Sequence, residues 1–191
     1  MSGKVQLYFY DGRTAENYPP TEEQLKAFPA FYRSRFKAAK VEHVRMQAAG
    51  SAFLLAKHLG ITSDDQLVRG EHGAPSLKDS SRFFSISHSG PFTVLAVSDA
   101  PVGVDIELEE SKQNYQRIAR RFFSPDFQAI IEEAPEERQH TVFLECWTKL
   151  EAALKADGTG FTVPRETFPE VLKKYDIETF HKEGLIISVA T

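Results

Sequence analysis

The sequence has little cysteine, no long apolar run and no excess of basic residues. Cys146 is the single cysteine among 191 residues, so no intramolecular disulfide can form and nothing in the cysteine usage points to export. No apolar segment is long enough to span a bilayer, and the first residues lack the apolar region of a secretory signal peptide. We therefore expect a cytoplasmic protein without a membrane segment.

The charge balance is slightly acidic, with a formal net charge of −4. This sign argues against nucleic acid as the partner, because general nucleic-acid binders are normally basic. The average hides an asymmetry: residues 26–57 are rich in Lys and Arg, whereas residues 105–137 are rich in Asp and Glu. Such an arrangement can hold an anionic ligand on one side and a metal ion on the other, or it can be two solvated helix faces of opposite sign.

Helical and extended patterns alternate along the chain, without low-complexity tracts or short repeats. Strand patterns occupy residues 5–10, 83–90, 91–99, 103–110, 161–168 and 185–191. Helical patterns occupy residues 21–28, 33–59 and 138–157, and a helix start is indicated at Ser124. The segment "SDAPVG", residues 98–103, is the best candidate for a boundary between two halves.

The stretch "GVDIELEE" places acids at alternate positions of an expected strand. Asp105, Glu107 and Glu109 then share one face, because side chains at i and i+2 of a strand point the same way. One interpretation is a half-solvated antiparallel strand. The other is a site for a hard cation, since close carboxylates repel each other unless a proton or metal lies between them.

The long helical pattern supplies a partner for these acids. Glu151 and Lys155 stand four residues apart, beside an apolar stripe that includes Trp147 and Leu150. Such a pair is commonly a surface ion pair worth a few tenths of a kcal/mol. Next to the acidic strand, Glu151 can instead complete a three-carboxylate metal site, with Lys155 one turn further along to hold a phosphate.

Three motifs together resemble those of the Sfp-type 4′-phosphopantetheinyl transferases. They are "FSISHSG" at residues 84–90, "GVDIE" at residues 103–107 and "WTKLEAALK" at residues 147–155. Their order and spacing fit the family from about Arg33 to the end of the chain. The resemblance implies an α+β fold of two similar halves related by a pseudo-twofold, residues 1–99 and 100–191, with coenzyme A and metal at the seam.

The resemblance also implies roles for individual residues. Asp105, Glu107 and Glu151 match the magnesium ligands of the family, with Mn²⁺ as a possible substitute for Mg²⁺. Lys155 matches its pyrophosphate-contacting lysine, and Glu151 is our candidate for the general base. The residues implied to bind coenzyme A, besides Lys155, are Arg45, Gly73, Ala74, Pro75, Ser87 and His88. For His88, a structural hydrogen-bonding role is the alternative.

The chain departs from the family pattern at two positions. Ala74 stands where many members have lysine, so Arg33, Arg35 or Lys37 has to supply that charge. Leu150 stands where many members have a lysine just before the motif glutamate, and Lys149 does not replace it because one helical residue is about 100° of rotation. A mechanism that needs a lysine at that position therefore does not transfer to this chain.

The implied activity is the transfer of the 4′-phosphopantetheine arm of coenzyme A to a serine of an apo acyl or peptidyl carrier protein, with release of 3′,5′-ADP. Fatty-acid, polyketide and nonribosomal peptide synthases all contain such carriers. Two halves in one chain are compatible with a monomer. Two alternatives stay open: a metal-dependent phosphodiesterase or nuclease, and a catalytically silent accessory protein that binds coenzyme A.

Carrier proteins are acidic, so their docking surface is expected to be apolar with a basic rim. The segment between the second and third motifs has this composition. The candidate docking residues are Arg117, Arg120, Arg121, Phe122, Phe123 and Phe127.

Overall fold

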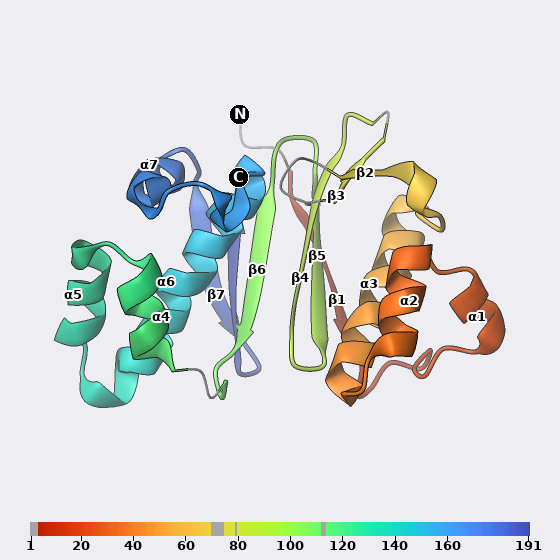
Figure 1. Cartoon of the computed structure of the whole chain (residues 1–191), viewed down its shortest axis with the longest axis horizontal. Helices are drawn as coiled ribbons and strands as arrows, with labels where there is room; N and C mark the ends of the chain where they lie inside the picture. The colour runs from red at the N-terminus through yellow and green to blue at the C-terminus, as the bar shows by residue number, and fades with distance from the viewer. Residues whose placement is uncertain (1–3, 70–74, 79, 112–113) are drawn as a thin grey trace.

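The computed structural model, which describes residues 4–69, 75–78, 80–111 and 114–191, has the mixed α+β architecture that the sequence predicts (Figure 1). Its strands pair antiparallel in two three-stranded sheets and one short hairpin. The first sheet has the order β1 (Gln6–Asp11), β5 (Phe92–Ser98), β4 (Phe83–Ser89). The second has the order β6 (Gly103–Leu108), β8 (Leu185–Ala190), β7 (Ile177–Lys182). The hairpin consists of β2 (Leu67–Arg69) and β3 (Pro75–Leu77).

Helices cover the two sheets from opposite sides of the molecule (Figure 1). The first group is α1 (Glu22–Lys26), α2 (Ala30–Ala38) and α3 (Glu42–Leu59). The second group is α4 (Tyr115–Phe122), α5 (Pro125–Glu133), α6 (Glu136–Asp157) and α7 (Phe168–Lys173). Short 3-10 turns occupy Asp64–Gln66, Gly160–Thr162 and Arg165–Thr167. None of the helices in the described part of the chain is long and apolar enough to cross a membrane.

Local sequence signals explain several helix ends. Thr21 and Gln24 form a capping box at the start of α1, and Ser124 caps α5 with Pro125 in its first turn. Gly60 ends α3 in the left-handed conformation, with φ of 68°, which glycine adopts without a Cβ penalty. These ends follow the sequence patterns.

Two predicted elements differ from the structure. The helix expected over residues 33–59 is broken at residues 39–41, where Ala39 and Val41 have extended backbone. The break lets Tyr32 and Phe36 of α2 pack into the same apolar cluster as the alanines of α3. The strand expected over residues 161–168 consists mainly of 3-10 turns, which Pro164 separates. Strand β7 was not predicted.

Three apolar clusters hold the fold together. One lies between the first sheet and its helices, and a second lies among α4 to α7, with Ile186 of β8. The third combines residues of β5 with residues of β6 and β8, so it belongs to both sheets; its buried members are Phe92, Val94, Ala96, Val102, Val104, Ile106, Leu185, Ile187 and Val189. The aliphatic face of β6 therefore packs into the shared cluster.

Strands β4 and β6 lie side by side where the two sheets meet (Figure 1). They belong to different sheets, and no backbone hydrogen bond joins them in the described ranges. We call this boundary the seam. The acidic face of β6, with Asp105 and Glu107, lies along the seam, and the candidate site is built around it.

Candidate functional site

The site begins where α6 crosses the acidic face of β6. Gly103 shares that face with Asp105 and Glu107, because the three residues alternate along the strand. A Cβ built on Gly103 would lie 1.8 Å from the carbonyl oxygen of Ala152. Only glycine permits this approach, which brings the C-terminal part of α6 close to the acids of β6.

The ammonium group of Lys155 links α6 to β6. Its Nζ lies 2.6 Å from Oδ1 of Asp105 and 3.3 Å from Oε2 of Glu151. The Asp105 side chain is 4% exposed and the Lys155 side chain 29%. Burial by itself lowers the pKa of Lys155, but Asp105 and Glu151 outweigh it and the pKa is raised. Lys155 therefore carries its charge at neutral pH.

At Glu151, burial has a larger effect on the pKa than the neighbouring charges have. Burial raises the pKa of its carboxyl group to about 7, and the charge of Asp105 and the weaker influence of Glu107 act in the same direction. Lys155 opposes this shift without cancelling it. The three acids of the predicted site thus interact electrostatically, and Glu151 titrates near neutrality.

Hydroxyl groups of β4 complete the polar network at the seam. Ser87 donates a hydrogen bond of 2.7 Å to Oδ1 of Asp105 and accepts one of 3.0 Å from Lys155. Ser89 donates a hydrogen bond of 2.8 Å to Oε2 of Glu107. Ser87 is among the residues predicted from the sequence and Ser89 is not, although the alternation of serines in "SISHS" indicates that they share one face of the strand.

His88 points to the other face of β4 and meets α2. Its Nε2 lies 3.4 Å from Nη2 of Arg35. Burial, followed by the nearby charge of Arg35, lowers the pKa of His88 to about 4. The imidazole is therefore neutral, and Arg35 carries the positive charge of this pair. An open groove lined by Phe31, Ser34, Asp64 and other residues of this region borders Arg35.

The other predicted cations are placed differently. Arg45 forms an ion pair of 3.7 Å with Glu42 and lies over the ring of Phe36, while its buried Nε has no hydrogen-bond partner. Arg33 donates a hydrogen bond of 3.0 Å to the carbonyl of Lys26, at the end of α1. Of the three candidate arginines, Arg35 is the one that the structure brings to His88.

The predicted segment Gly73-Ala74-Pro75 is only partly described. Gly73 and Ala74 lie outside the described residues. Pro75 starts β3 and is paired in register with Arg69 of β2.

The described residues provide oxygen donors suitable for a metal ion, but these donors do not converge into a formed metal site. No group of three or more His, Cys, Asp or Glu side chains in the described ranges converges closely enough to hold a metal ion. Asp105 Oδ2 is nevertheless buried without a hydrogen-bond partner, while Lys155 and Ser87 both contact Oδ1. A buried carboxylate oxygen without a partner, beside two further carboxylates, fits a hard cation such as Mg²⁺ in the chemistry of its donors.

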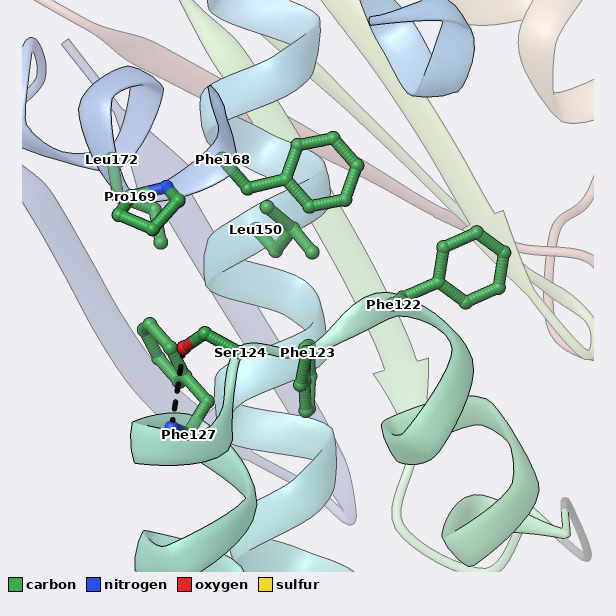
Figure 2. Close-up of a pocket in the computed structure, with 8 residues that line it drawn as sticks. All are labelled: Phe122, Phe123, Ser124, Phe127, Leu150, Phe168, Pro169 and Leu172. Atoms are coloured by element: carbon green, nitrogen blue, oxygen red, sulfur yellow. Dashed lines mark hydrogen bonds between the residues drawn. The ribbon is translucent and has the colours of Figure 1, made fainter. Parts of the chain in front are cut away.

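Leu150 lies on the side of α6 away from these acids. It is 2% exposed and lines a small apolar cavity with residues of α7 and of the α4–α5 connection (Figure 2). Its departure from the family pattern therefore changes the apolar core and not the polar network. The cavity is also lined by Phe122, Phe123, Ser124, Phe127, Phe168, Pro169 and Leu172.

The predicted docking residues differ in exposure, and Phe122 and Phe127 are partly buried against the core cluster. Phe123 is 4% exposed and belongs to the core cluster among α4 to α7, so its side chain is not available at the surface. Arg117, Arg120 and Arg121 are exposed. Trp147 and Cys146, both buried, pack in the same core cluster, as the apolar stripe predicts.

Comparisons with known proteins match this chain to one superfamily. A family model described as "4'-phosphopantetheinyl transferase superfamily" matches residues 101–184. The chain is 41% identical over 175 residues to the 4′-phosphopantetheinyl transferase psf-1 of Bacillus pumilus, covering 86% of this chain and 71% of that protein.

Other relatives match over a shorter range. The 4′-phosphopantetheinyl transferase Sfp of Bacillus subtilis is 32% identical over 107 residues, which cover 56% of this chain and 47% of Sfp. HetI of Nostoc is 32% identical over 128 residues, which cover 62% and 54% of the two chains. The chain thus spans about half the length of these two relatives. From the extent of the match to psf-1, the chain belongs to the 4′-phosphopantetheinyl transferase superfamily.

Proposed function

We propose that this protein transfers the 4′-phosphopantetheine arm of coenzyme A to a serine hydroxyl of an apo acyl or peptidyl carrier protein. The observation that carries the proposal is the convergence of Asp105, Glu151 and Lys155 at the seam, in two motifs typical of the family. The names of the relatives support the same reaction.

The reaction breaks the phosphoanhydride bond of coenzyme A and forms a phosphoester bond to serine. The serine oxygen of the carrier attacks the β-phosphorus of coenzyme A, the bond from that phosphorus to the bridging pyrophosphate oxygen breaks, and 3′,5′-ADP leaves. Negative charge grows on the pyrophosphate oxygens as this bond breaks. Lys155 places a fixed positive charge beside them, which stabilises the transition state more than the ground state.

Glu151 is the proposed acceptor of the serine proton. A pKa of about 7 allows the carboxylate to be ionised in much of the enzyme at neutral pH and still to bind a proton. Asp105 is less suited to accept the proton, because Ser87 and Lys155 both donate hydrogen bonds to its Oδ1. We assign proton transfer to Glu151 for this reason.

Asp105, Glu107 and Glu151 are the residues that would hold Mg²⁺, with Mn²⁺ as a substitute. When bound, the ion would neutralise charge on the pyrophosphate and align the leaving group. The fit is supported by the unpartnered Oδ2 of Asp105 and by the carboxylate oxygens beside it.

Arg35 and His88 are the proposed contacts of the 3′-phosphate. Arg35 brings the charge, and the neutral imidazole of His88 can donate one hydrogen bond. The groove beside Arg35 would then hold the adenosine part. Pro75 is a further candidate for contact with it, as the family pattern implies. Arg33 and Arg45 are further candidates from the sequence.

The remaining proposals concern the whole molecule. We propose that residues 1–99 and 100–191 act as two halves with the substrate at the seam, and that the protein works as a cytoplasmic monomer. The exposed Arg117, Arg120 and Arg121 would face the acidic carrier.

The test is to incubate the protein with coenzyme A, Mg²⁺ and an apo carrier protein, and to weigh the carrier. A gain equal to one phosphopantetheine group, abolished by EDTA and restored by Mg²⁺ or Mn²⁺, is expected. A carrier with a serine-to-alanine change at the acceptor is the control and should gain nothing. Coenzyme A binding without transfer would favour the silent accessory protein, and hydrolysis of a phosphodiester substrate would favour the nuclease.

A further inference from the structure

Strand β4 presents three serines to the seam. Ser85, Ser87 and Ser89 alternate along the strand and therefore share one face. They are 7%, 7% and 9% exposed, so each hydroxyl is removed from water and must find its partners inside the protein.

All three hydroxyls reach β6. Ser85 accepts a hydrogen bond of 3.0 Å from the backbone N–H of Val104. Ser87 reaches Asp105, one residue further along β6, and Ser89 reaches Glu107. Ser89 also accepts a hydrogen bond of 3.1 Å from the N–H of Leu108. Side-chain hydroxyls thus make the contacts that a backbone ladder makes inside each sheet.

The donors and acceptors fix the direction of these bonds. A serine hydroxyl has one hydrogen to donate, and an ionised carboxylate can only accept. Ser87 therefore gives its hydrogen to Asp105 and receives one from Lys155, while Ser89 gives its hydrogen to Glu107 and receives one from the backbone. The two serines therefore contact Asp105 at Oδ1 and Glu107 at Oε2.

Ser85 has a different role in the same row. Its hydroxyl accepts a hydrogen bond from the backbone N–H of Val104, whereas Asp105 and Glu107 accept hydrogen bonds from the other two serines. Loss of its hydroxyl should cost stability without releasing an acid. Ser85 is therefore a matched control for Ser87 and Ser89, whose hydroxyls bond to carboxylates.

We propose that Ser87 and Ser89 are positioning residues, which orient the carboxylates of Asp105 and Glu107 for a divalent cation. The inference rests on the proposed function, because the cation belongs to the proposed site. It assigns Ser89 a role for the first time and gives Ser87 a role beyond contact with coenzyme A. Groups that orient metal ligands typically change metal affinity by 10- to 100-fold when removed.

The experiment measures Mn²⁺ binding by electron paramagnetic resonance in the full-length protein, without coenzyme A or carrier. The variants are Ser87→Ala, Ser89→Ala and the control Ser85→Ala, each with its Tm. We expect the first two to bind Mn²⁺ about tenfold or more weakly than the wild type. Ser85→Ala should lower the Tm and leave Mn²⁺ affinity within about twofold, since the Ser85 hydroxyl bonds to the backbone N–H of Val104.

A conservative variant separates orientation from packing. Ser89→Thr keeps the hydroxyl and should retain more Mn²⁺ affinity than Ser89→Ala. Wild-type affinity in both alanine variants would overturn the proposal, and so would an equal loss in Ser85→Ala. A wild-type protein that binds no Mn²⁺ would also overturn it, whatever the carrier assay shows. Binding with the expected ratios but no carrier modification would uphold the positioning role and refute the proposed transfer.

Discussion

Lys155 and Glu151 are four residues apart on α6, as many surface ion pairs are, but they are surrounded differently. Their side chains are 29% and 23% exposed, and Lys155 also contacts the buried Asp105. Glu170 and Lys173 form an ordinary exposed pair on α7, with both side chains at least 70% exposed. The two pairs give a direct comparison between a site and a surface.

We predict that Lys155→Ala and Glu151→Gln each lower kcat by about 10²-fold or more, because a placed charge or an acid–base group typically supplies that much. Lys173→Ala should leave kcat unchanged and shift the free energy of unfolding by less than about 1 kcal/mol. Steady-state carrier modification and chemical denaturation measure the two quantities. Near-wild-type turnover in both site variants would show that the pair is not part of the reaction.

Arg35 and Arg45 are alternative candidates for binding the 3′-phosphate of coenzyme A. Arg35 contacts His88, whereas Arg45 is paired with Glu42. The wild type should prefer coenzyme A over dephospho-coenzyme A in kcat/KM. Arg35→Ala and His88→Ala should reduce that preference, because the charge and the hydrogen bond to the phosphate are gone. A reduced preference in Arg45→Ala alone would move the phosphate to the start of α3.

His88 should also make stability depend on pH. Its folded pKa of about 4 lies below the ordinary value of 6.5, so between these values the unfolded chain binds more protons. Stability should therefore fall as the pH is lowered from about 6.5 to about 4. Urea unfolding across this window should show a smaller fall in His88→Gln. His43→Gln changes an exposed histidine as a control, and an unchanged slope in His88→Gln would refute the assignment.

At the scale of elements, α6 has two working faces. One carries Glu151 and Lys155 toward β6, and the other buries Leu150 among aromatic residues of α4, α5 and α7 and of the α4–α5 connection (Figure 2). The close approach at Gly103 sets the distance of the first face from the acids. The helix can therefore accept changes on the apolar side only if the volume and polarity of the core are kept.

Leu150→Lys should destabilise the protein, because it buries an unpaired charge in an apolar cluster. We expect a loss of about 3 kcal/mol or more in the free energy of unfolding, seen as a lower Tm. Leu150→Met is the control, and it should cost less than about 1.5 kcal/mol because the volume is similar. A stable and faster Leu150→Lys enzyme would mean that this face of α6 reaches the reaction after all.

Sequence patterns predicted the elements that carry the site better than the elements around it. The strands expected at residues 83–90, 91–99 and 103–110 and the long helix are found, because the extended and helical patterns are strong there. The break between α2 and α3 was missed, since Ala39 is compatible with a helix and only packing decides against it. Strand β7 was missed because its sequence "IETFHK" is mostly polar.

The same contrast holds for the side chains of the site. Asp105, Glu107, Glu151 and Lys155 could be named from spacing and resemblance. The contacts of Ser89 and Arg35 could not, because they join segments that are 18 and 53 residues apart in the sequence. Local periodicity tells which face a residue occupies, but not which distant strand or helix covers that face.

At the scale of the whole molecule, the two sheets share one apolar cluster and a polar seam, while each has its own second cluster with its helices. The connection between the sheets runs through residues 99–102, of which Asp99 and Pro101 are exposed. No backbone ladder crosses from β4 to β6 in the described residues.

This seam makes the protein suited to complementation between fragments. If the chain is opened after Asp99, no sheet loses a strand, and the pieces keep matching apolar and hydroxyl–carboxylate surfaces. Co-expressed fragments 1–99 and 100–191 should therefore co-purify and recover carrier modification, whereas opening the chain after Ser87 should abolish both. Because the fragments associate by themselves, fusing each to another protein would join those two proteins in one complex that labels a carrier covalently.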